Sequence, residues 1–479
     1  MTLGNCTIAN LDGVTIPSVT RGLVYSLDDE TMTATVSGRG SFTGGNLVFP
    51  STVAYDEKTY KVTQINAKLF QSLTYDLYIP DSVITLVGGG GSGTFGNATI
   101  DKAYIGSGVK TIGEETFSGS KGYSVFVCKA KPEYINKHAF NAMQNVACTE
   151  IVEFDFSELK RVEDVAFNSC QLRVIANFSD KLEFIGENAF LRSNVVEAYI
   201  PAGATVSTSS FNTAQALTLM IFEVAEGETK LFPLQFLSAA GALNNFSLVI
   251  TGKITFTGNA PFPGRSGQKL YLPDIEALEA MLKNYVENVQ NDNNKSRIES
   301  FTVYVCETGK TYKAYQNGTY SETGTATENH IYSEVAHYEA DCSNFERDEK
   351  YCYSCNHKVK SNEGTVLGNH IFETYTKLPS CQSIGYTEFD CTVCDLQEVG
   401  AFVDKTAHLN TVEKYGALNG SNLEVSYYCE YCNTLDRTEN VSLVNKCYIE
   451  GYGLFDATST LDYISVDANG VVAPSGATF

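Results

Sequence analysis

One six-residue motif recurs through the first half of this 479-residue chain and constrains its fold more than any other feature. Each copy begins with an apolar residue, continues with three mostly polar residues and a mostly small residue, and ends in Phe. Six copies follow this pattern: Ile65–Phe70, Ile112–Phe117, Ile135–Phe140, Val162–Phe167, Ile185–Phe190 and Val206–Phe211. Looser copies end at Phe95, Phe236 and Phe262, and successive Phe residues are then 21 to 27 residues apart.

A period of this length corresponds to one coil of a solenoid. One coil cannot bury its own apolar edge, whereas stacked coils bury a continuous column to which each Phe would contribute bulk. Between the motifs lie strand-like segments that end at Pro or Gly, such as Leu77–Pro80 and Ala198–Pro201. They predict one short strand per coil, joined into a parallel sheet along one flank. The expected fold class is therefore mostly β, with short helical turns around each Phe.

The sequences of Ile112–Phe117 and Ile185–Phe190, with Tyr78–Val83 between copies, resemble the BspA-type leucine-rich repeat. The resemblance covers roughly residues 15–300. It implies cell-surface adhesion by protein or glycan binding, and no catalysis. The glycine-rich stretch Gly88–Gly93 departs from the repeat, which leaves the shape of that coil open.

A helix near 274–290 is expected to close the solenoid at its C-terminal end. Asp274 follows Pro273 and is a good N-cap residue. The apolar residues that follow it recur at helical spacing and would share one face of the helix. These residues are Ile275, Leu278, Leu282, Tyr285 and Val289. The stretch Phe301–Cys306 is then expected as an edge strand.

The predicted organisation has five parts. A β-rich N-terminal cap spans residues 1–60, and the leucine-rich-repeat solenoid spans 61–306. Residues 307–329 are poor in apolar side chains and predict a linker or a loose β segment. Three cysteine-rich repeats follow at 330–447, and a C-terminal β segment at 448–479 completes the chain.

Ten of the fourteen cysteines lie after residue 300. Two repeats align there, each with a Cys, nine residues, a Cys-x2-Cys pair and a later His. In a third repeat Asn419 replaces the first Cys, and Cys447 stands where His is expected, while His330 precedes the first repeat as His370 precedes the second. The candidate metal ligands are Cys342, Cys352, Cys355 and His370, then Cys381, Cys391, Cys394 and His408, then Cys429, Cys432 and Cys447.

Three roles for these cysteines compete. Structural zinc fits a Cys-x2-Cys pair with a distant Cys and a His from the same repeat, because four such ligands surround a tetrahedral ion. Disulfides would cross-link modules that have little core, although three cysteines in a repeat leave one unpaired. Thiol exchange is disfavoured, because the repeated array lacks the βαβ setting of such sites. With either zinc or disulfides, the cysteines hold small domains together.

The repeats are also similar to the cysteine repeats of Gram-positive bacterial surface proteins. The segments that carry this similarity are Leu378–Cys381 and Phe389–Cys394. The similarity implies a stalk or spacer with no known ligand. Structural zinc is the one cofactor that the sequence suggests.

Charge and missing motifs exclude several functions. The net charge of −22 repels nucleic acid and anionic lipid. No run of 18 or more apolar residues exists, so membrane insertion is not expected. The stretch Gly88–Gly93 matches a dinucleotide-binding fingerprint, but no helix pattern follows it to receive a phosphate. No nucleophile, His and acid are placed by a known motif, and we therefore expect no enzyme.

The sequence therefore predicts a non-enzymatic extracellular or cell-surface recognition protein. Its expected partners are proteins or glycans that bind the leucine-rich-repeat surface, with self-association as a further possibility. The alternative is a structural stalk, fibre or virion component. The N-terminal stretch does not resemble a signal peptide, so the expected route out of the cell is a signal already removed or release inside a lysing virus.

Overall fold

The computed structural model describes residues 16–449 apart from short gaps at 90, 92, 145, 148, 239–244, 260, 327–329, 409–410 and 445. Beyond these it describes only short strands at 453–456, 460–461, 465–466, 472–473 and 477–478, so most of the predicted C-terminal segment lies outside the described residues. The chain divides into two compact units. The first is Met1–Val335 with Lys350–Val359, and the second is Ala336–Glu349 with Lys360–Phe479.

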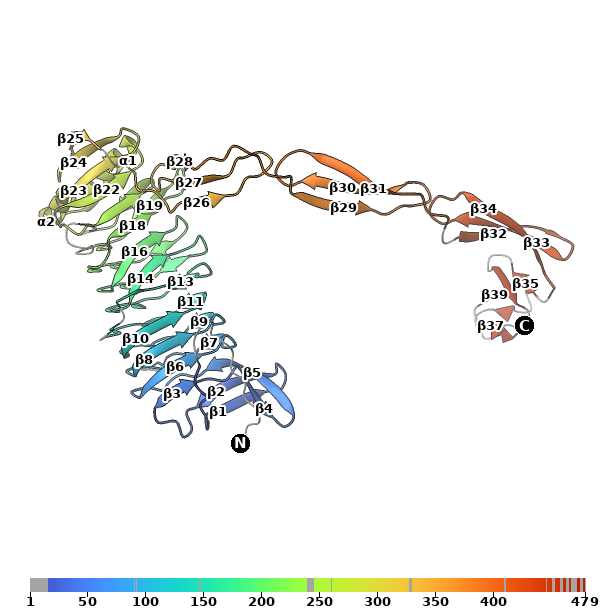
Figure 1. The fold of residues 1–479 in the computed structure, drawn as a ribbon, viewed down its shortest axis with the longest axis horizontal. Coiled ribbons are helices and arrows are strands. Elements are labelled where there is room, and N and C mark those ends of the chain that lie inside the picture. The colour runs from blue at the N-terminus through green and yellow to red at the C-terminus, as the bar shows by residue number, and fades with distance from the viewer. Residues whose placement is uncertain are drawn as a thin grey trace. The chain divides into compact units, whose positions relative to one another are not determined.

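The first unit contains a β-solenoid of about 10 turns over residues 33–271 (Figure 1). The whole chain is mostly β with 6% helix, which confirms the predicted fold class. Most coils contribute a two-residue strand to a narrow sheet and a longer strand to a wide sheet, which is one strand per coil more than the sequence predicted. The extra strand forms because the apolar residue that opens each motif pairs with its counterpart in the next coil, as Ile112 pairs with Leu86 and Ile135.

The narrow sheet is parallel along the coils and gains antiparallel strands at its N-terminal end. β1 pairs with β2 and β4 pairs with β5, while a separate parallel pair, β19 and β21, lies further along the chain. The strands are β1 (Val24–Asp28), β2 (Thr33–Gly38), β4 (Thr52–Tyr55), β5 (Lys58–Ile65), β7 (Thr85–Leu86), β9 (Thr111–Ile112), β11 (Tyr134–Ile135), β13 (Arg161–Val162), β15 (Phe184–Ile185), β17 (Thr205–Val206), β19 (Thr229–Phe232) and β21 (Lys253–Phe256).

The wide sheet has two sections, ordered β10-β8-β6-β3 and β12-β14-β16-β18-β20-β22-β23-β24-β25. All neighbours are parallel up to β23, and the last two strands turn back antiparallel. The strands are β3 (Gly45–Val48), β6 (Thr74–Ile79), β8 (Thr99–Ile105), β10 (Lys121–Cys128), β12 (Ile151–Val152), β14 (Arg173–Asn177), β16 (Val195–Ile200), β18 (Leu219–Phe222), β20 (Ser247–Ile250), β22 (Gln268–Leu272), β23 (Phe301–Val305), β24 (Lys310–Ala314) and β25 (Tyr320–Thr325).

The Phe residues of the motifs stack along the solenoid axis and form what we call the Phe column. Consecutive rings lie 4.7–6.1 Å apart between centroids with interplanar angles of 6–29°. Every ring of the column is buried, because a ring at the same place in each coil is covered by the coils on both sides. The column comprises Phe70, Phe95, Phe117, Phe140, Phe167, Phe190 and Phe211.

The stacking changes after Phe211, where the register shifts by one residue. The backbone N–H of Phe190 donates to the carbonyl of Ser210, whereas that of Phe211 donates to the carbonyl of Phe236. Leu237 therefore occupies the motif-ending position that the sequence assigned to Phe236. The Phe236 ring instead meets Phe211 edge-on, with centroids 5.5 Å apart at 89°.

Two residues of most coils adopt positive φ, one two places before the column Phe and one two places after it. In the coil of Phe167 these are Val165, at φ 62°, and Ser169, at φ 54°. The chain around each Phe is therefore a pair of tight turns rather than a helix. The backbone N–H of each column Phe then reaches the next coil, as Phe167 reaches Ala189 O at 2.6 Å.

The glycine-rich coil is built like the others. It supplies β7 and β8 to the two sheets, and Phe95 to the column. Its glycines are required by close packing, because a Cβ at Gly88 would lie 1.7 Å from the Glu114 carbonyl oxygen. Gly93 is similarly close to Glu115 O, at 1.7 Å. These glycines therefore serve coil-to-coil contact, and the described residues place no helix after them.

The predicted cap helix is confirmed as α1 (Ile275–Asn288) at the end of the solenoid (Figure 1). The Asp274 side chain accepts a hydrogen bond from Ala277 N at 2.7 Å, and Leu278, Leu282 and Tyr285 are buried. The short helices α2 (Asp292–Lys295) and η1 (Ser296–Ser300) lead into β23.

Residues 307–326 contain β24 and β25, so this stretch is a β segment, the second of the two expectations, and not a linker. Tyr312 and Ala314 of β24 are buried against the solenoid core, which gives the segment its place in the wide sheet. The sparse apolar residues allowed a loose β segment but gave no signal of its pairing with the wide sheet.

The cysteine-rich part forms three small antiparallel sheets, ordered β26-β27-β28, β29-β30-β31 and β32-β33-β34. Among the described residues of the second unit, the buried apolar side chains are Leu423, Val425 and Cys429. These sheets therefore have little core. Their strands are β26 (Ala336–Tyr338), β27 (Arg347–Tyr351), β28 (Lys358–Ser361), β29 (Phe372–Lys377), β30 (Gly385–Cys391), β31 (Gln397–Val403), β32 (Thr411–Asn419), β33 (Asn422–Cys429) and β34 (Leu435–Ser442), followed by β35 (Lys446–Ile449) and β36 (Gly453–Asp456).

Candidate metal centres

Three clusters of side chains, each with three Cys and one His, lie along the cysteine-rich part. Within each cluster the four possible ligand atoms lie within 4.8 Å of one another. The first cluster is Cys306, His330, Cys352 and Cys355; the second is Cys342, His370, Cys391 and Cys394; the third is Cys381, His408, Cys429 and Cys432.

Each Cys-x2-Cys pair lies in the turn between the second and third strands of a sheet, and we call this turn a knuckle. The first Cys ends the strand or lies directly after it, and the second follows in the turn. In the first knuckle Asn356 N donates to Cys352 O at 2.9 Å, and in the third Asn433 N donates to Cys429 O at 2.8 Å. Both Asn residues have positive φ, which lets the chain close the turn with both thiols on one side.

The other two ligands of each cluster precede the knuckle in the chain. The His lies shortly before the first strand of the same sheet, as His370 precedes β29. The distant Cys belongs to the preceding structural element: Cys342 lies between β26 and β27, and Cys381 lies between β29 and β30. Cys306 occupies the matching place directly after β23. Each cluster therefore joins a knuckle to the first hairpin of the sheet before it.

The distances within the clusters fit one tetrahedral ion. The distant Cys and the first knuckle Cys have sulfur atoms 3.8 Å apart in the first cluster and 3.6 Å apart in the other two. The second knuckle sulfur lies 3.4–3.5 Å from the His Nδ1. A tetrahedral zinc ion bound at its usual lengths would separate two sulfurs by about 3.8 Å, and a sulfur and a nitrogen by about 3.5 Å.

The same distances do not fit disulfides, in which the sulfur atoms are about 2.05 Å apart. The structure joins none of the described cysteines in a disulfide. A hydrogen bond from Cys306 lowers the pKa of the Cys352 thiol, with help from the Cys355 N–H. At Cys429 the N–H of Cys432 has the largest effect and also lowers the pKa. The first cysteine of each of these two knuckles therefore favours the thiolate, which is the form that binds metal, whereas burial raises the pKa of Cys355.

The sequence identified most of these ligands but grouped them within one repeat. In the structure Cys342 and His370 join Cys391 and Cys394 of the next repeat instead of Cys352 and Cys355. The third knuckle needs no further ligand from its own repeat, because the second repeat supplies its His and its distant Cys. The backbone of Cys447 lies in β35, but its side chain is outside the described residues.

Sequence reasoning missed two ligands of the first cluster, Cys306 and His330. The available signal was the position of His330, which precedes the first repeat as His370 precedes the second. Cys306 has no such signal, since it follows a strand of the solenoid. The three clusters therefore have the donor set and the geometry to hold metal ions.

Comparison with known protein families identifies the repeats of the solenoid. The sequence model of the BspA type leucine rich repeat region matches residues 57–154 and 90–218, with 6 copies of the repeat. Residues 57–218 are a BspA-type leucine-rich repeat region. No curated protein and no solved structure matches the chain. BspA-type repeats are a structural or binding family of surface proteins rather than a generally enzymatic one.

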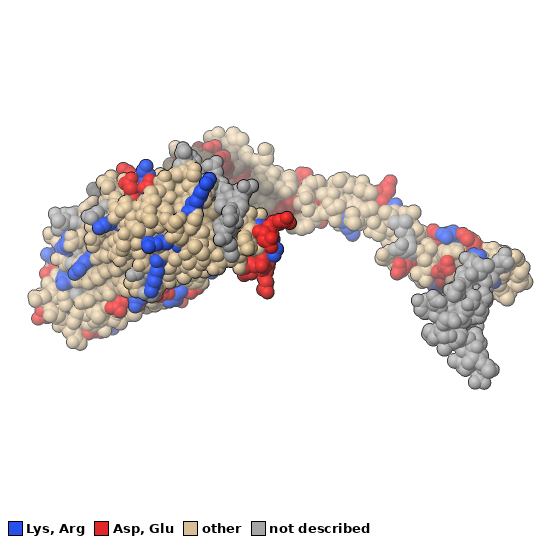
Figure 2. Space-filling view, turned by 90° about the horizontal axis from the view of Figure 1, so that it is seen from below, with Lys and Arg blue, Asp and Glu red and all other residues tan. Residues whose placement is uncertain are grey.

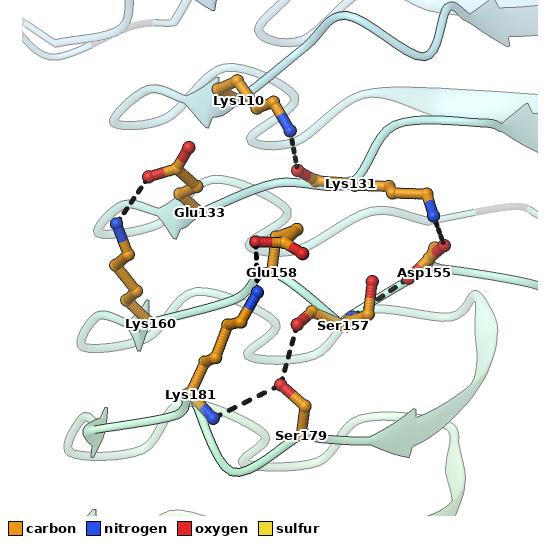
Figure 3. Close-up of polar contacts among 9 residues, drawn as sticks. All are labelled: Lys110, Lys131, Glu133, Asp155, Ser157, Glu158, Lys160, Ser179 and Lys181. Carbon is orange, nitrogen blue, oxygen red and sulfur yellow. Dashed lines mark hydrogen bonds and ion pairs between the residues drawn. The ribbon is translucent and has the colours of Figure 1, made fainter. Parts of the chain in front are cut away.

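The BspA-type region carries ion pairs that join one coil to the next (Figure 3). Lys160 Nζ lies 2.7 Å from a Glu133 carboxylate oxygen, and Lys181 Nζ lies 2.6 Å from Glu158. Lys131 pairs with Asp155 at 2.9 Å. A hydrogen bond from Ser157 and the pair with Lys131 hold the pKa of Asp155 at about 2. These exposed pairs are screened by solvent and add little stability each, so they support the stacking without driving it.

The outward face of the wide sheet in the BspA-type region is partly apolar. Tyr78 and Tyr104 stack there with ring centroids 5.1 Å apart, and Val127 follows Tyr104 in register. One face of the larger part of the molecule also shows several Lys and Arg side chains with few acidic ones between them (Figure 2). In the part of the chain that the structure describes, no helix has the length and apolar character needed to span a membrane.

Proposed function

We propose that this protein is a non-enzymatic extracellular recognition protein that binds protein or glycan partners through the wide sheet of its BspA-type region. The observation that carries the proposal is a solenoid of about 10 stacked coils, seven of which share the Phe column. Coils that share a buried column form a rigid scaffold, and the outward rows of a parallel sheet then keep fixed spacings. Because such a surface is already rigid, binding a partner costs little conformational entropy, and this favours affinity.

Tyr104 and Lys102 of β8 are the side chains we place at the centre of this surface. Both point away from the core, since Ala103 and Ile105 between and after them are buried. A Tyr ring beside a Lys suits the CH-rich face of a sugar or the mixed surface of a protein. The same face includes the stacked partner ring of Tyr78.

We propose that the ions of the three clusters are zinc. Three thiolates and one imidazole are soft ligands, and zinc accepts them in tetrahedral geometry without a redox change. With four protein ligands each site is closed to substrate, so its role is structural. A series of metal-held sheets with little core of their own suits a spacer that carries the recognition surface away from its anchor point. It also suits the stalk or virion component that remains the second candidate.

Binding of the purified chain to a glycan array and to a panel of immobilised extracellular-matrix proteins tests the recognition function. The double variant Tyr104→Ser with Lys102→Glu should bind its best probe at least tenfold more weakly. The matched control is Tyr134→Ser with Lys110→Glu, which makes the same chemical changes on the flank of the narrow sheet and should bind as the wild type does. No binding by the wild type, or equal losses in both variants, would overturn the proposal.

A further inference from the structure

The second section of the wide sheet has an outward apolar row that is separate from the solenoid core. Five side chains follow one another in register across β16, β18, β20, β22 and β23. The rings of Tyr271 and Tyr304 stack with centroids 4.7 Å apart. This outward row comprises Tyr199, Ile221, Val249, Tyr271 and Tyr304.

The three central members of the outward row are buried although they face away from the core, and Tyr199 and Tyr304 at its ends are partly buried. Val249 is 0% exposed and Tyr271 is 2% exposed. The side chains that cover the row are Ile331 and Tyr353, and the Tyr353 ring lies 5.9 Å from that of Tyr199. The cover therefore comes from a segment that is distant in sequence from the solenoid and belongs to the same compact unit.

Both covering residues are neighbours of metal ligands in the first cluster. Ile331 directly follows His330, and Tyr353 lies between Cys352 and Cys355. Next to Tyr353, the Ser354 hydroxyl donates to Ile250 O at 3.3 Å, so the knuckle also contacts the end of β20. The fourth ligand, Cys306, follows β23 and is thus fixed to the solenoid.

Without a bound ion, the cover would be held by the contacts of Ile331 and Tyr353 with the row, by the Ser354 hydrogen bond and by the backbone hydrogen bond from Tyr353 N to Ile331 O. The knuckle has no core of its own, since Cys352 and Ser354 are the buried side chains that the structure describes between residues 350 and 359. Four ligands around one ion would fix the position of both covering residues relative to β23. The burial of the outward row is therefore coupled to the metal site.

We propose that a zinc ion in the first cluster fastens the knuckle onto the wide sheet and so keeps the outward row buried. The inference rests on the proposed zinc content of the clusters. In this inference the first cluster holds its knuckle against the solenoid. The other two clusters lack this role, because they join their knuckles to sheets of the second unit. Loss of this ion uncovers an apolar surface on the side of the solenoid.

The test compares two double variants of the full chain. Cys306→Ser with His330→Ala removes the first cluster, and Cys342→Ser with His370→Ala removes the second. Native mass spectrometry should count three zinc ions in the wild type and two in each variant. Hydroxyl-radical footprinting should show several-fold faster labelling of Tyr199 and Tyr271 in the first variant and unchanged labelling in the second.

Different results would contradict the zinc content of the clusters and the fastening role of the first cluster. A wild-type chain without zinc would overturn the proposed metal, whereas two zinc ions with unchanged labelling of Tyr271 in the first variant would overturn the fastening role alone. If the first variant does not fold, the wild type is treated with a chelator and then with zinc. Labelling of Tyr199 and Tyr271 should then rise and fall again, and constant labelling through both steps would contradict the inference.

Discussion

At the scale of single residues, each coil depends on a bulky ring and on two turns with positive φ. The ring was predicted from the sequence, because a Phe that returns every two dozen residues is typical of stacked coils. The turns were not predicted, since the residues at these positions include Lys, Glu, His, Val and Asn, as in Val165 and Asn188. The backbone hydrogen bonds between coils impose the turn at every copy, whatever side chain stands there.

This difference between neighbouring coils gives a first prediction. Val165 is β-branched and has φ 62°, whereas Asn188 holds the same place one coil later at φ 56°. Asn tolerates the left-handed region and Val does not, at a cost of roughly 1–2 kcal/mol. Val165→Asn should therefore raise the free energy of unfolding by about 1 kcal/mol, and Asn188→Val should lower it by a similar amount.

Urea unfolding of the two variants, followed by circular dichroism, measures both changes. The pair controls for position in the coil, because the two residues hold the same place in successive coils, two residues before Phe167 and Phe190. Changes of the same sign in both variants would show that side-chain packing, rather than φ, decides stability at this position.

At the scale of strands and turns, the spacing of residues along the chain predicted local structure well. It predicted poorly which metal ligands of different repeats come together. The cap helix follows from consecutive residues, so Asp274 and the apolar spacing after it were sufficient. The metal ligands were found as residue types, but their grouping depends on which hairpin lies beside which knuckle. Within one repeat Cys342 is closer in sequence to Cys352 than to Cys391, and only the structure shows that Cys391 is its partner.

This staggered grouping gives a second prediction. Cys342→Ser should expose Cys391 and Cys394 to alkylation, because they lose a shared ligand, and should leave Cys352 and Cys355 protected. Ligands of one closed site lose their protection together when the ion is lost. Timed iodoacetamide labelling with peptide mass spectrometry reads each thiol separately. Faster labelling of Cys352 instead of Cys391 would show that Cys342 shares a site with Cys352 and Cys355 of its own repeat.

At the scale of the whole chain, the two units are stabilised by different means. The solenoid buries a continuous apolar core along its length, whereas the described part of the second unit buries few apolar side chains. Small domains without a sufficient core depend on metal or cross-links. Where a metal site forms only in the folded state, its binding free energy becomes folding free energy.

We therefore expect two thermal transitions, of which chelation should affect one. In differential scanning calorimetry, EDTA should lower the midpoint of the transition of the second unit by more than 10 °C or abolish it, and zinc should restore it. The solenoid transition should shift by far less. Acidification should act as EDTA does, because protons compete with the ion for His and thiolate ligands. Equal shifts of both transitions would contradict separate stabilisation.

The staggered clusters also bear on how such a chain can change its length. Each cysteine-rich repeat contributes a knuckle to the metal site before it, and a Cys and a His to the metal site after it. Removal of residues 343–381 would leave Cys306 and His330 facing Cys391 and Cys394, and Cys342 and His408 facing Cys429 and Cys432. Every site would remain complete with no orphan thiol. Unequal recombination between repeats could therefore shorten or lengthen the tail by whole units while each intermediate still folds.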